Sequence, residues 1–188
     1  MAISINQLES GIGLQIDGNI WLVQEYQHVK PGKGSAFVRV KLRNLTTDQV
    51  LERTYRSAET LNDVELEERR LQNLYTSGDE VHFMDYTTYE ETVVPKALMG
   101  DGIKFLQESL EVTAICHNNK VLKVILPNFI ITQVAQSETG LKGDSSKAGT
   151  KPAVIDTGAL IQVPLFINQG DWIKLDTRTG TYVERVQK

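Results

Sequence analysis

Short β-prone runs that end at tight-turn residues recur along the whole chain, and they form the strongest pattern in the sequence. Apolar residues alternate with small or polar ones from Ile12 to Ile16, and Asp17-Gly18 separates this run from Ile20–Val23. Asp-Gly between apolar runs indicates a hairpin, because a type I′ turn needs positive φ at both central residues. Similar dipeptides occur at Ser77-Gly78, Asn118-Asn119 and Thr179-Gly180.

The runs beside these dipeptides are rich in β-branched residues, which favours strands. They are Val81–Phe83, Val112–Ile115, Val121–Leu126, Ile161–Ile167 and Trp172–Leu175. Helical signals are few: Pro95 could begin a short helix through Met99, and Lys104–Leu110 could add a turn or two. The segment Asp63–Leu74 is ambiguous, because its charge suits a helix while two strands with a bend fit equally well.

Strands at this spacing without alternating long helices predict an all-β protein built of small barrels or sandwiches. A barrel of five or six strands needs about 60 residues, so three fit in the 188 residues of the chain. We expect three domains, at 1–63, 64–127 and 128–188, with the second boundary at Pro127-Asn128.

Composition excludes several classes of protein. At 40% hydrophobic and 23% charged, the chain resembles neither a disordered nor a membrane protein. No apolar run approaches the roughly 20 residues that span a bilayer, and the N-terminus has no basic region or apolar core of a secretory signal. A single cysteine, Cys116, allows no intrachain disulfide and no cysteine-based zinc cluster. We therefore expect a reduced, cytoplasmic, monomeric protein with no membrane partner.

The net charge of −4 is unevenly distributed. Residues 1–63 carry 7 basic and 7 acidic groups, residues 64–127 carry 6 and 11, and residues 128–188 carry 7 and 6. Within the first third, Tyr26–Thr47 has no acidic residue but five basic ones: Lys30, Lys33, Arg39, Lys41 and Arg43. This stretch could face nucleic-acid phosphate. The alternative is a solvated basic strand face.

The centre of this stretch has the composition of a sharp loop tip. Pro31 fixes φ near −65°, while Gly32 and Gly34 admit backbone conformations closed to other residues. Lys33 between the two glycines would extend from the tip, where its ammonium group is a compact charge open to RNA or to a modifying enzyme. An ordinary hairpin tip with an exposed lysine is the alternative.

Several motifs in this order resemble one family. The run Val29–Leu45 (VKPGKGSAFVRVKLRNL) is similar to the modified-lysine loop and following strand of bacterial translation elongation factor P. Further similarities extend over essentially the whole chain: Leu51–Tyr55, Phe83-Met84-Asp85, Thr88-Tyr89-Glu90, Lys151-Pro152-Ala153, Gly158, Ile161, Val163-Pro164, Ile167, Gly170, Asp176-Thr177-Arg178 and Tyr182-Val183.

The resemblance implies a fold and a role. It implies an SH3-like, KOW-type barrel followed by two OB-like barrels, in an L shape that resembles tRNA. Members of the family bind the bacterial ribosome between the peptidyl and exit sites and relieve stalling at consecutive prolines. Lys33 would then reach toward the acceptor end of the peptidyl-tRNA. A modifying enzyme would lengthen Lys33; lysine rather than arginine there is consistent with a β-lysyl or aminopentanol-type arm, and the sequence does not choose between them.

The resemblance also assigns RNA contacts. Around the lysine loop these are Lys30, Pro31, Gly32, Gly34, Ser35, Arg39, Lys41 and Arg43, which would meet tRNA and ribosomal RNA. A C-terminal loop with Gly143, Asp144, Ser145 and Thr150 would approach the exit-site codon. Tyr182 and Arg185 would make further ribosomal RNA contacts, unless they simply belong to an exposed final strand.

Enzyme and cofactor sites find no support in the sequence. The Gly-rich segment Gly140–Thr150 lacks the spacing of a phosphate-binding loop. Cys116 and His117 would point to opposite faces of a strand, and the histidines His28, His82 and His117 have no metal-ligand spacing. We expect no catalytic residue, no metal and no cofactor. The alternatives are a paralogue with another ribosomal role, or a generic OB-fold RNA-binding module, for which stacking aromatics would be expected.

Overall fold

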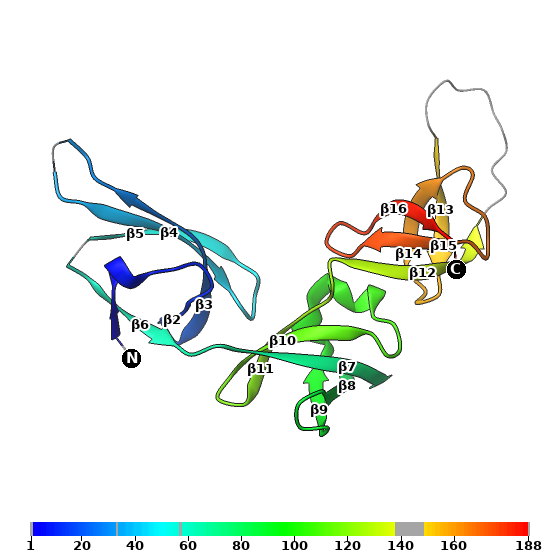
Figure 1. The fold of residues 1–188 in the computed structure, drawn as a ribbon, viewed down its shortest axis with the longest axis horizontal. Coiled ribbons are helices and arrows are strands. Elements are labelled where there is room, and N and C mark those ends of the chain that lie inside the picture. The colour runs from blue at the N-terminus through cyan, green and yellow to red at the C-terminus, as the bar shows by residue number, and fades with distance from the viewer. Residues whose placement is uncertain (1, 33, 57, 138–148, 188) are drawn as a thin grey trace. The chain divides into compact units, whose positions relative to one another are not determined.

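The computed structural model describes residues 2–32, 34–56, 58–137 and 149–187 (Figure 1). Within these ranges the chain forms sixteen strands and two short 3₁₀ helices, so the all-β prediction is confirmed. The strands belong to three antiparallel sheets that follow one another along the chain.

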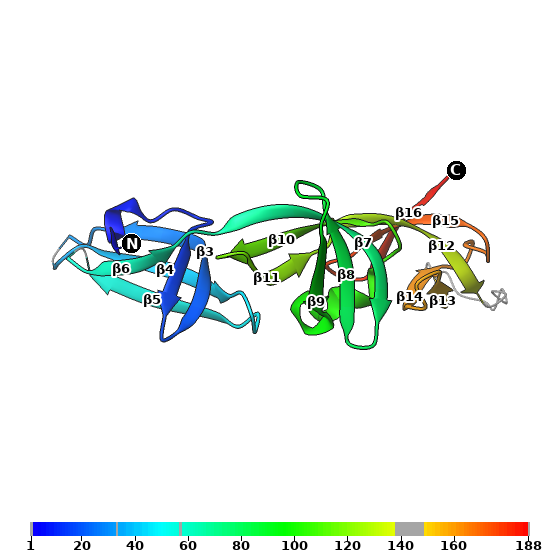
Figure 2. The same cartoon turned by 90° about the horizontal axis from the view of Figure 1, so that it is seen from below.

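The first sheet has six strands in the order β1-β6-β2-β3-β4-β5. In Figures 1 and 2 it curls around the short helix η1 (Ile5–Gln7). The strands are β1 (Ala2–Ser4), β2 (Gly13–Ile16), β3 (Asn19–Val29), β4 (Phe37–Asn44), β5 (Val50–Arg56) and β6 (Thr60–Val64).

The second and third sheets have five strands each, in the orders β11-β10-β7-β8-β9 and β14-β13-β12-β15-β16. The second comprises β7 (Glu67–Ser77), β8 (Glu80–Asp85), β9 (Glu91–Pro95), β10 (Glu111–His117) and β11 (Lys120–Ile125), with helix η2 (Lys96–Phe105) between β9 and β10. The third comprises β12 (Phe129–Ser137), β13 (Thr150–Ile155), β14 (Leu160–Pro164), β15 (Trp172–Asp176) and β16 (Thr181–Val186).

The predicted hairpin turns are present. Asp17 and Gly18 have φ of 51° and 79°, and Asn118 and Asn119 have φ of 49° and 63°, as a type I′ turn requires. At Ser77-Gly78 the turn lies one residue further on, because Ser77 still pairs with Glu80. Local sequence thus placed the hairpins to within a residue.

The structure shows which secondary structure the ambiguous segment and the two predicted helical segments adopt. Two strands cover residues 63–74, because β6 ends at Val64 and β7 begins at Glu67. Pro95 ends β9 and caps η2, which Gly100 interrupts with a φ of 53°. The helix predicted from Lys104 to Leu110 is wrong beyond Phe105, where η2 ends.

Contacts group the chain into two compact units. The first contains residues 1–69 and 114–123, and the second contains residues 70–113 and 124–188. The borders of both units fall within strands of the second sheet. The division into domains 1–63, 64–127 and 128–188 stays a prediction.

A continuous apolar core lies inside the first unit. Its largest contributions come from alternate residues of strands and from η1, as expected where one face of a sheet is buried. The buried members are Ile5, Leu8, Leu14, Trp21, Val23, Val38, Val40, Leu42 and Tyr55. This core holds β3 and β4, which carry the lysine loop.

Candidate nucleic-acid interface

The loop between β3 and β4 follows the last paired residues, Val29 and Phe37. Its members Lys30, Pro31, Gly32, Gly34 and Ser35 are all exposed. Gly34 has a φ of +113°, a backbone conformation that side-chain-bearing residues rarely adopt. Lys33 lies outside the described residues. The backbone around it nevertheless leaves the sheet at the end of two long strands.

The three basic residues of β4 lie on one face. Val38, Val40 and Leu42 are at most 1% exposed and point into the core. The residues between them therefore point outward, because successive side chains of a strand alternate between faces. Arg39 and Arg43 are exposed and Lys41 is partly exposed.

Strand register gives each of these cations different neighbours. Arg39 lies between Gln27 of β3 and Thr54 of β5, both neutral. Lys41 lies between two acids, Glu25 and Glu52. On the folded surface, acidic residues of the neighbouring strands therefore interrupt the basic stretch that the sequence shows.

Two of the three cations have acidic partners. Lys41 Nζ lies 3.5 Å from a carboxylate oxygen of Glu25. Arg43 Nε lies 3.4 Å from Asp48, whose carboxylate also binds Lys123 of β11. Within the described part of the chain, Arg39 has no ion-pair partner. Arg39 is therefore the β4 cation with the most freedom to meet an external phosphate.

His28 and Tyr26 lie near the same loop on the opposite side of β3. Their rings meet edge to face with centroids 5.7 Å apart. By register they are opposite Val38 and Val40, on the core side of the sheet. Both side chains are nevertheless exposed, so they contact each other outside the buried core.

The C-terminal candidates lie on the third sheet. Thr150 is exposed and opens β13, opposite Pro164. Gly143, Asp144 and Ser145 lie outside the described residues. Tyr182 is partly buried opposite Leu175, and Arg185 is exposed, with its guanidinium 3.9 Å from Asp171. Both β16 residues face the same side of the sheet as their buried partners, although β16 is an edge strand.

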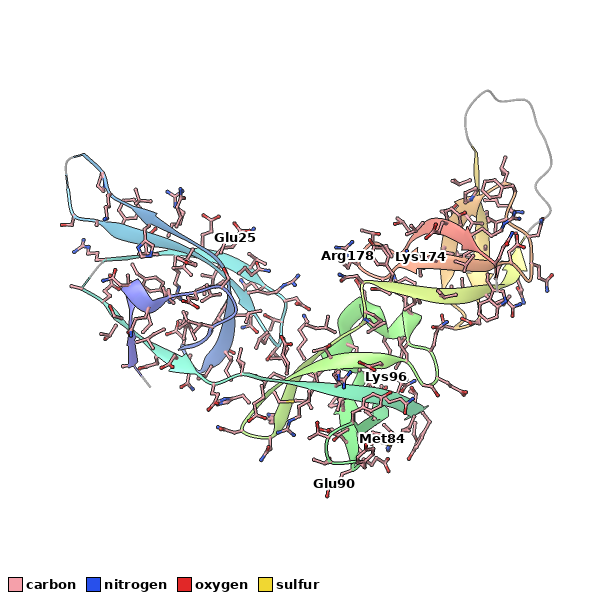
Figure 3. All side chains as sticks on the ribbon, viewed as in Figure 1. Glu25, Met84, Glu90, Lys96, Lys174 and Arg178 are labelled. Atoms are coloured by element: carbon pink, nitrogen blue, oxygen red, sulfur yellow. The ribbon has the colours of Figure 1, made fainter. Side chains whose placement is uncertain are left out.

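Sequence reasoning missed an exposed ring on this sheet that carries two cations. Phe129 is 45% exposed, and Lys174 Nζ and Arg178 Cζ lie 5.1 Å and 5.7 Å from its ring centroid. Figure 3 shows Lys174 and Arg178 near each other. Arg178 also donates to Asp176 at 2.7 Å, and this bond holds the pKa of Asp176 below its usual range. Only strand pairing brings these residues together, so the sequence held no signal for them.

A cluster of two aromatic rings and one glutamate lies on the second sheet. The rings of Tyr75 and His82 stack with centroids 4.2 Å apart, and both side chains hydrogen-bond to Glu91. The hydrogen bond from His82, followed by that from Tyr75, lowers the pKa of Glu91. The bond to Glu91 in turn raises the pKa of the Tyr75 hydroxyl.

Cys116 and His117, the two reactive residue types that are adjacent in the sequence, lie on β10. Cys116 is buried. The Nδ1 atom of His117 lies 2.8 Å from the main-chain carbonyl of Glu65. Among the residues that the structure describes, no group of three or more His, Cys, Asp or Glu side chains could hold a metal ion. No helix in the same ranges is long and apolar enough to cross a membrane.

Family models cover nearly the whole chain in three consecutive matches. Residues 4–61 match the "Elongation factor P (EF-P) KOW-like domain", residues 66–124 the "Elongation factor P (EF-P) OB domain", and residues 130–185 "Elongation factor P, C-terminal". These matches assign a KOW-like and an OB fold to the first two thirds of the chain.

Comparison with individual proteins gives the same family. The chain is 48% identical to elongation factor P of Microcystis aeruginosa and 45% identical to that of Moorella thermoacetica, each over 97% of this chain and 99% of the relative. Among solved structures, translation initiation factor 5A from Methanococcus jannaschii matches at 25% identity and a TM-score of 0.51, over 68% of this chain and 92% of that one. The chain therefore belongs to the elongation factor P family of translation factors.

Proposed function

We propose that this translation factor binds the ribosome between the peptidyl and exit tRNA sites and stimulates peptide-bond formation at consecutive prolines. The observation that carries the proposal is the exposed loop at the end of β3 and β4, with Lys33 at its centre. A long two-stranded hairpin anchored in a core can present one side chain at a distance from the body of its sheet. The family membership supports the same role.

The proposed mechanism is positioning. Proline is a poor nucleophile for peptide transfer because its ring restricts the geometry of attack. Holding the acceptor end of the peptidyl-tRNA in a reactive pose lowers the barrier without any acid or base from the factor. A lengthened Lys33 would keep a positive charge near RNA phosphates and hydroxyls while extending further from the loop. The reaction itself would be catalysed by ribosomal RNA.

The other site residues would fix the factor in register. Lys30, Gly32, Ser35 and Arg39 would contact the acceptor stem and ribosomal RNA through phosphate, because such contacts position a protein without reading sequence. On the third sheet, Thr150 would contact RNA near the exit-site codon, and Tyr182 and Arg185 would make further contacts with ribosomal RNA. A modifying enzyme in the cytoplasm would act on Lys33 through its open loop.

The decisive experiment measures stalling directly. Toe-printing on a message with three consecutive proline codons would compare the wild type with Lys33→Ala, using purified ribosomes. We expect Lys33→Ala to fold normally and to lose rescue, while Lys120→Ala, which removes an exposed lysine on β11, keeps it. Equal rescue by the wild type and Lys33→Ala would disprove the proposed role of the lysine.

A further inference from the structure

We propose that Glu25 and Glu52 form an acidic row that confines RNA phosphate to the loop end of the outward face of the first sheet. The proposal rests on the proposed ribosome binding and concerns the specificity of the same site. It assigns a function to two acidic residues that lie among the basic ones only after folding. The row comprises Glu25, Lys41 and Glu52.

Strand register creates the row. Glu25 of β3, Lys41 of β4 and Glu52 of β5 are directly opposite one another, so their side chains share the outward face. One lysine between two glutamates gives the row a formal charge of −1. The Lys41 ammonium is 3.5 Å from Glu25, whose side chain is 76% exposed. Figure 3 marks the position of Glu25 on this face of the hairpin.

The adjacent row toward the loop has the opposite character. It contains Arg39 between the neutral residues Gln27 and Thr54. An open cleft of about 370 Å³ joins the two rows, and its lining includes Arg39, Lys41 and both glutamates. Phosphate entering this cleft would therefore meet one free cation on one side and two carboxylates on the other.

The next row, that of Arg43, is also a poor site for phosphate, because its cation has an acidic partner. There Arg43 lies 3.4 Å from Asp48. Starting from the loop, the outward face of β4 thus presents a free cation, an acidic row and then a cation that already has an acidic partner. Effective phosphate binding is left to the loop and Arg39.

The distances make the effect strong enough to matter. Rows two residues apart on a strand are separated by about 7 Å, which is within the Debye length of about 8 Å at physiological salt. An RNA strand that runs along β4 would pass over the carboxylates and lose affinity by repulsion. An RNA strand that touches only the loop end would not. The row would therefore suppress binding to RNA in general while sparing the intended contact.

The test uses charge-matched double variants. Glu25→Gln/Glu52→Gln removes the acidic row. Glu80→Gln/Glu90→Gln makes the same charge change at two exposed residues, one at the start of β8 and one in the loop between β8 and β9. Glu90 is visible in Figure 3. Fluorescence anisotropy would measure binding to a labelled 20-nucleotide uridine RNA across a range of KCl concentrations, after thermal melting has shown that each variant is folded.

We expect the row variant to bind this RNA about fivefold more tightly than the wild type, the upper range for exposed ion pairs. The slope of log affinity against log salt should steepen by roughly 0.7 for each phosphate contact regained on a single strand. The control variant should remain within about twofold of the wild type, because its glutamates belong to the other compact unit and line no part of the cleft beside Arg39. Equal affinities and slopes for the row and control variants would overturn the proposal.

A ribosome arm separates this proposal from the proposed function. Sedimentation with purified ribosomes would compare Arg39→Gln with Arg43→Gln, and we expect the first to weaken binding about fivefold and the second less than twofold. Equal losses of ribosome affinity in the two variants would contradict the proposal that Arg39 is free for phosphate while Arg43 is not. A wild type that does not bind ribosomes at all would contradict the proposed function, while the uridine RNA arm would still decide on the acidic row.

Discussion

Gln107 donates its side-chain amide to the main-chain carbonyl of Ile131, 3.1 Å away. Ile131 lies in the part of β12 that pairs with β15, whereas pairing with β13 starts only at Val134. The same amide is 3.3 Å from the carboxylate of Asp156, which also accepts the Thr132 hydroxyl at 2.6 Å. A side chain from the segment after η2 thus occupies a place on β12 where a neighbouring strand would otherwise donate.

Removal of this amide should loosen the start of β12. For Gln107→Ala we expect a loss of about 1 kcal/mol in the free energy of unfolding, typical of one hydrogen bond. Hydrogen exchange should accelerate in residues 129–133. Urea denaturation and exchange mass spectrometry would measure the two effects. Gln162→Ala, at an exposed position of β14, is the matched control; exchange at the same rate in both variants would contradict the role of Gln107.

Asp85 should tolerate an amide but not a methyl group. Its buried carboxylate accepts the main-chain N–H groups of Thr87 at 2.7 Å and Thr88 at 3.3 Å. Asp85→Ala leaves both donors without this acceptor and should cost about 1–3 kcal/mol. Asp85→Asn keeps an acceptor oxygen and should cost clearly less in the same urea experiment.

The first sheet contains a natural precedent for this exchange. There Asn44 accepts the N–H groups of Thr46 and Thr47 at 2.8 Å and 3.0 Å through its amide oxygen. An amide oxygen therefore suffices for the turn. If Asp85→Asn were as unstable as Asp85→Ala, the negative charge rather than the acceptor geometry would hold the turn.

The Tyr75, His82 and Glu91 cluster predicts a pH dependence. The hydrogen bond from His82, followed by that from Tyr75, lowers the pKa of Glu91. The ionised Glu91 carboxylate therefore contributes to the stability of the fold at pH values above 4.5, the ordinary pKa of glutamate. The contribution is lost as the pH falls through the lowered value. The urea midpoint of the wild type should therefore exceed that of Glu91→Gln at pH 5, and the gap should narrow at pH 3. The same measurements on Glu80→Gln, which removes an exposed carboxylate of β8 outside the cluster, serve as the control.

Lys33 should carry a covalent addition in protein isolated from the native host. The glycines on either side leave its amine open to an enzyme, and an extended arm suits the proposed positioning role. Intact-mass measurement followed by peptide mass spectrometry of the 29–45 segment would detect and name the group. Protein that is unmodified yet fully active on consecutive prolines would refute this prediction.

Some elements could be predicted because their causes are local. Positive φ at Asp17-Gly18 and at Asn118-Asn119 follows from the residues at the turns themselves. The segment 63–74 could not be resolved in the same way, because its charges suit a helix as well as a strand. Its pairing partners decide: β6 pairs with β1 and β2, and β7 pairs with β8, which lies further along the chain.

The β character, the hairpins and the exposed loop around the glycines could be predicted from the sequence alone, since each depends on neighbouring residues. The sequence also predicted the family. Which cations of β4 remain free depends instead on the pairing of strands that are distant in the sequence. Glu25 and Glu52 are 27 residues apart in the chain, and strand register places them on either side of Lys41. Electrostatic interaction depends on distance in space, so a stretch without acids in the sequence becomes a folded face with acids on both sides.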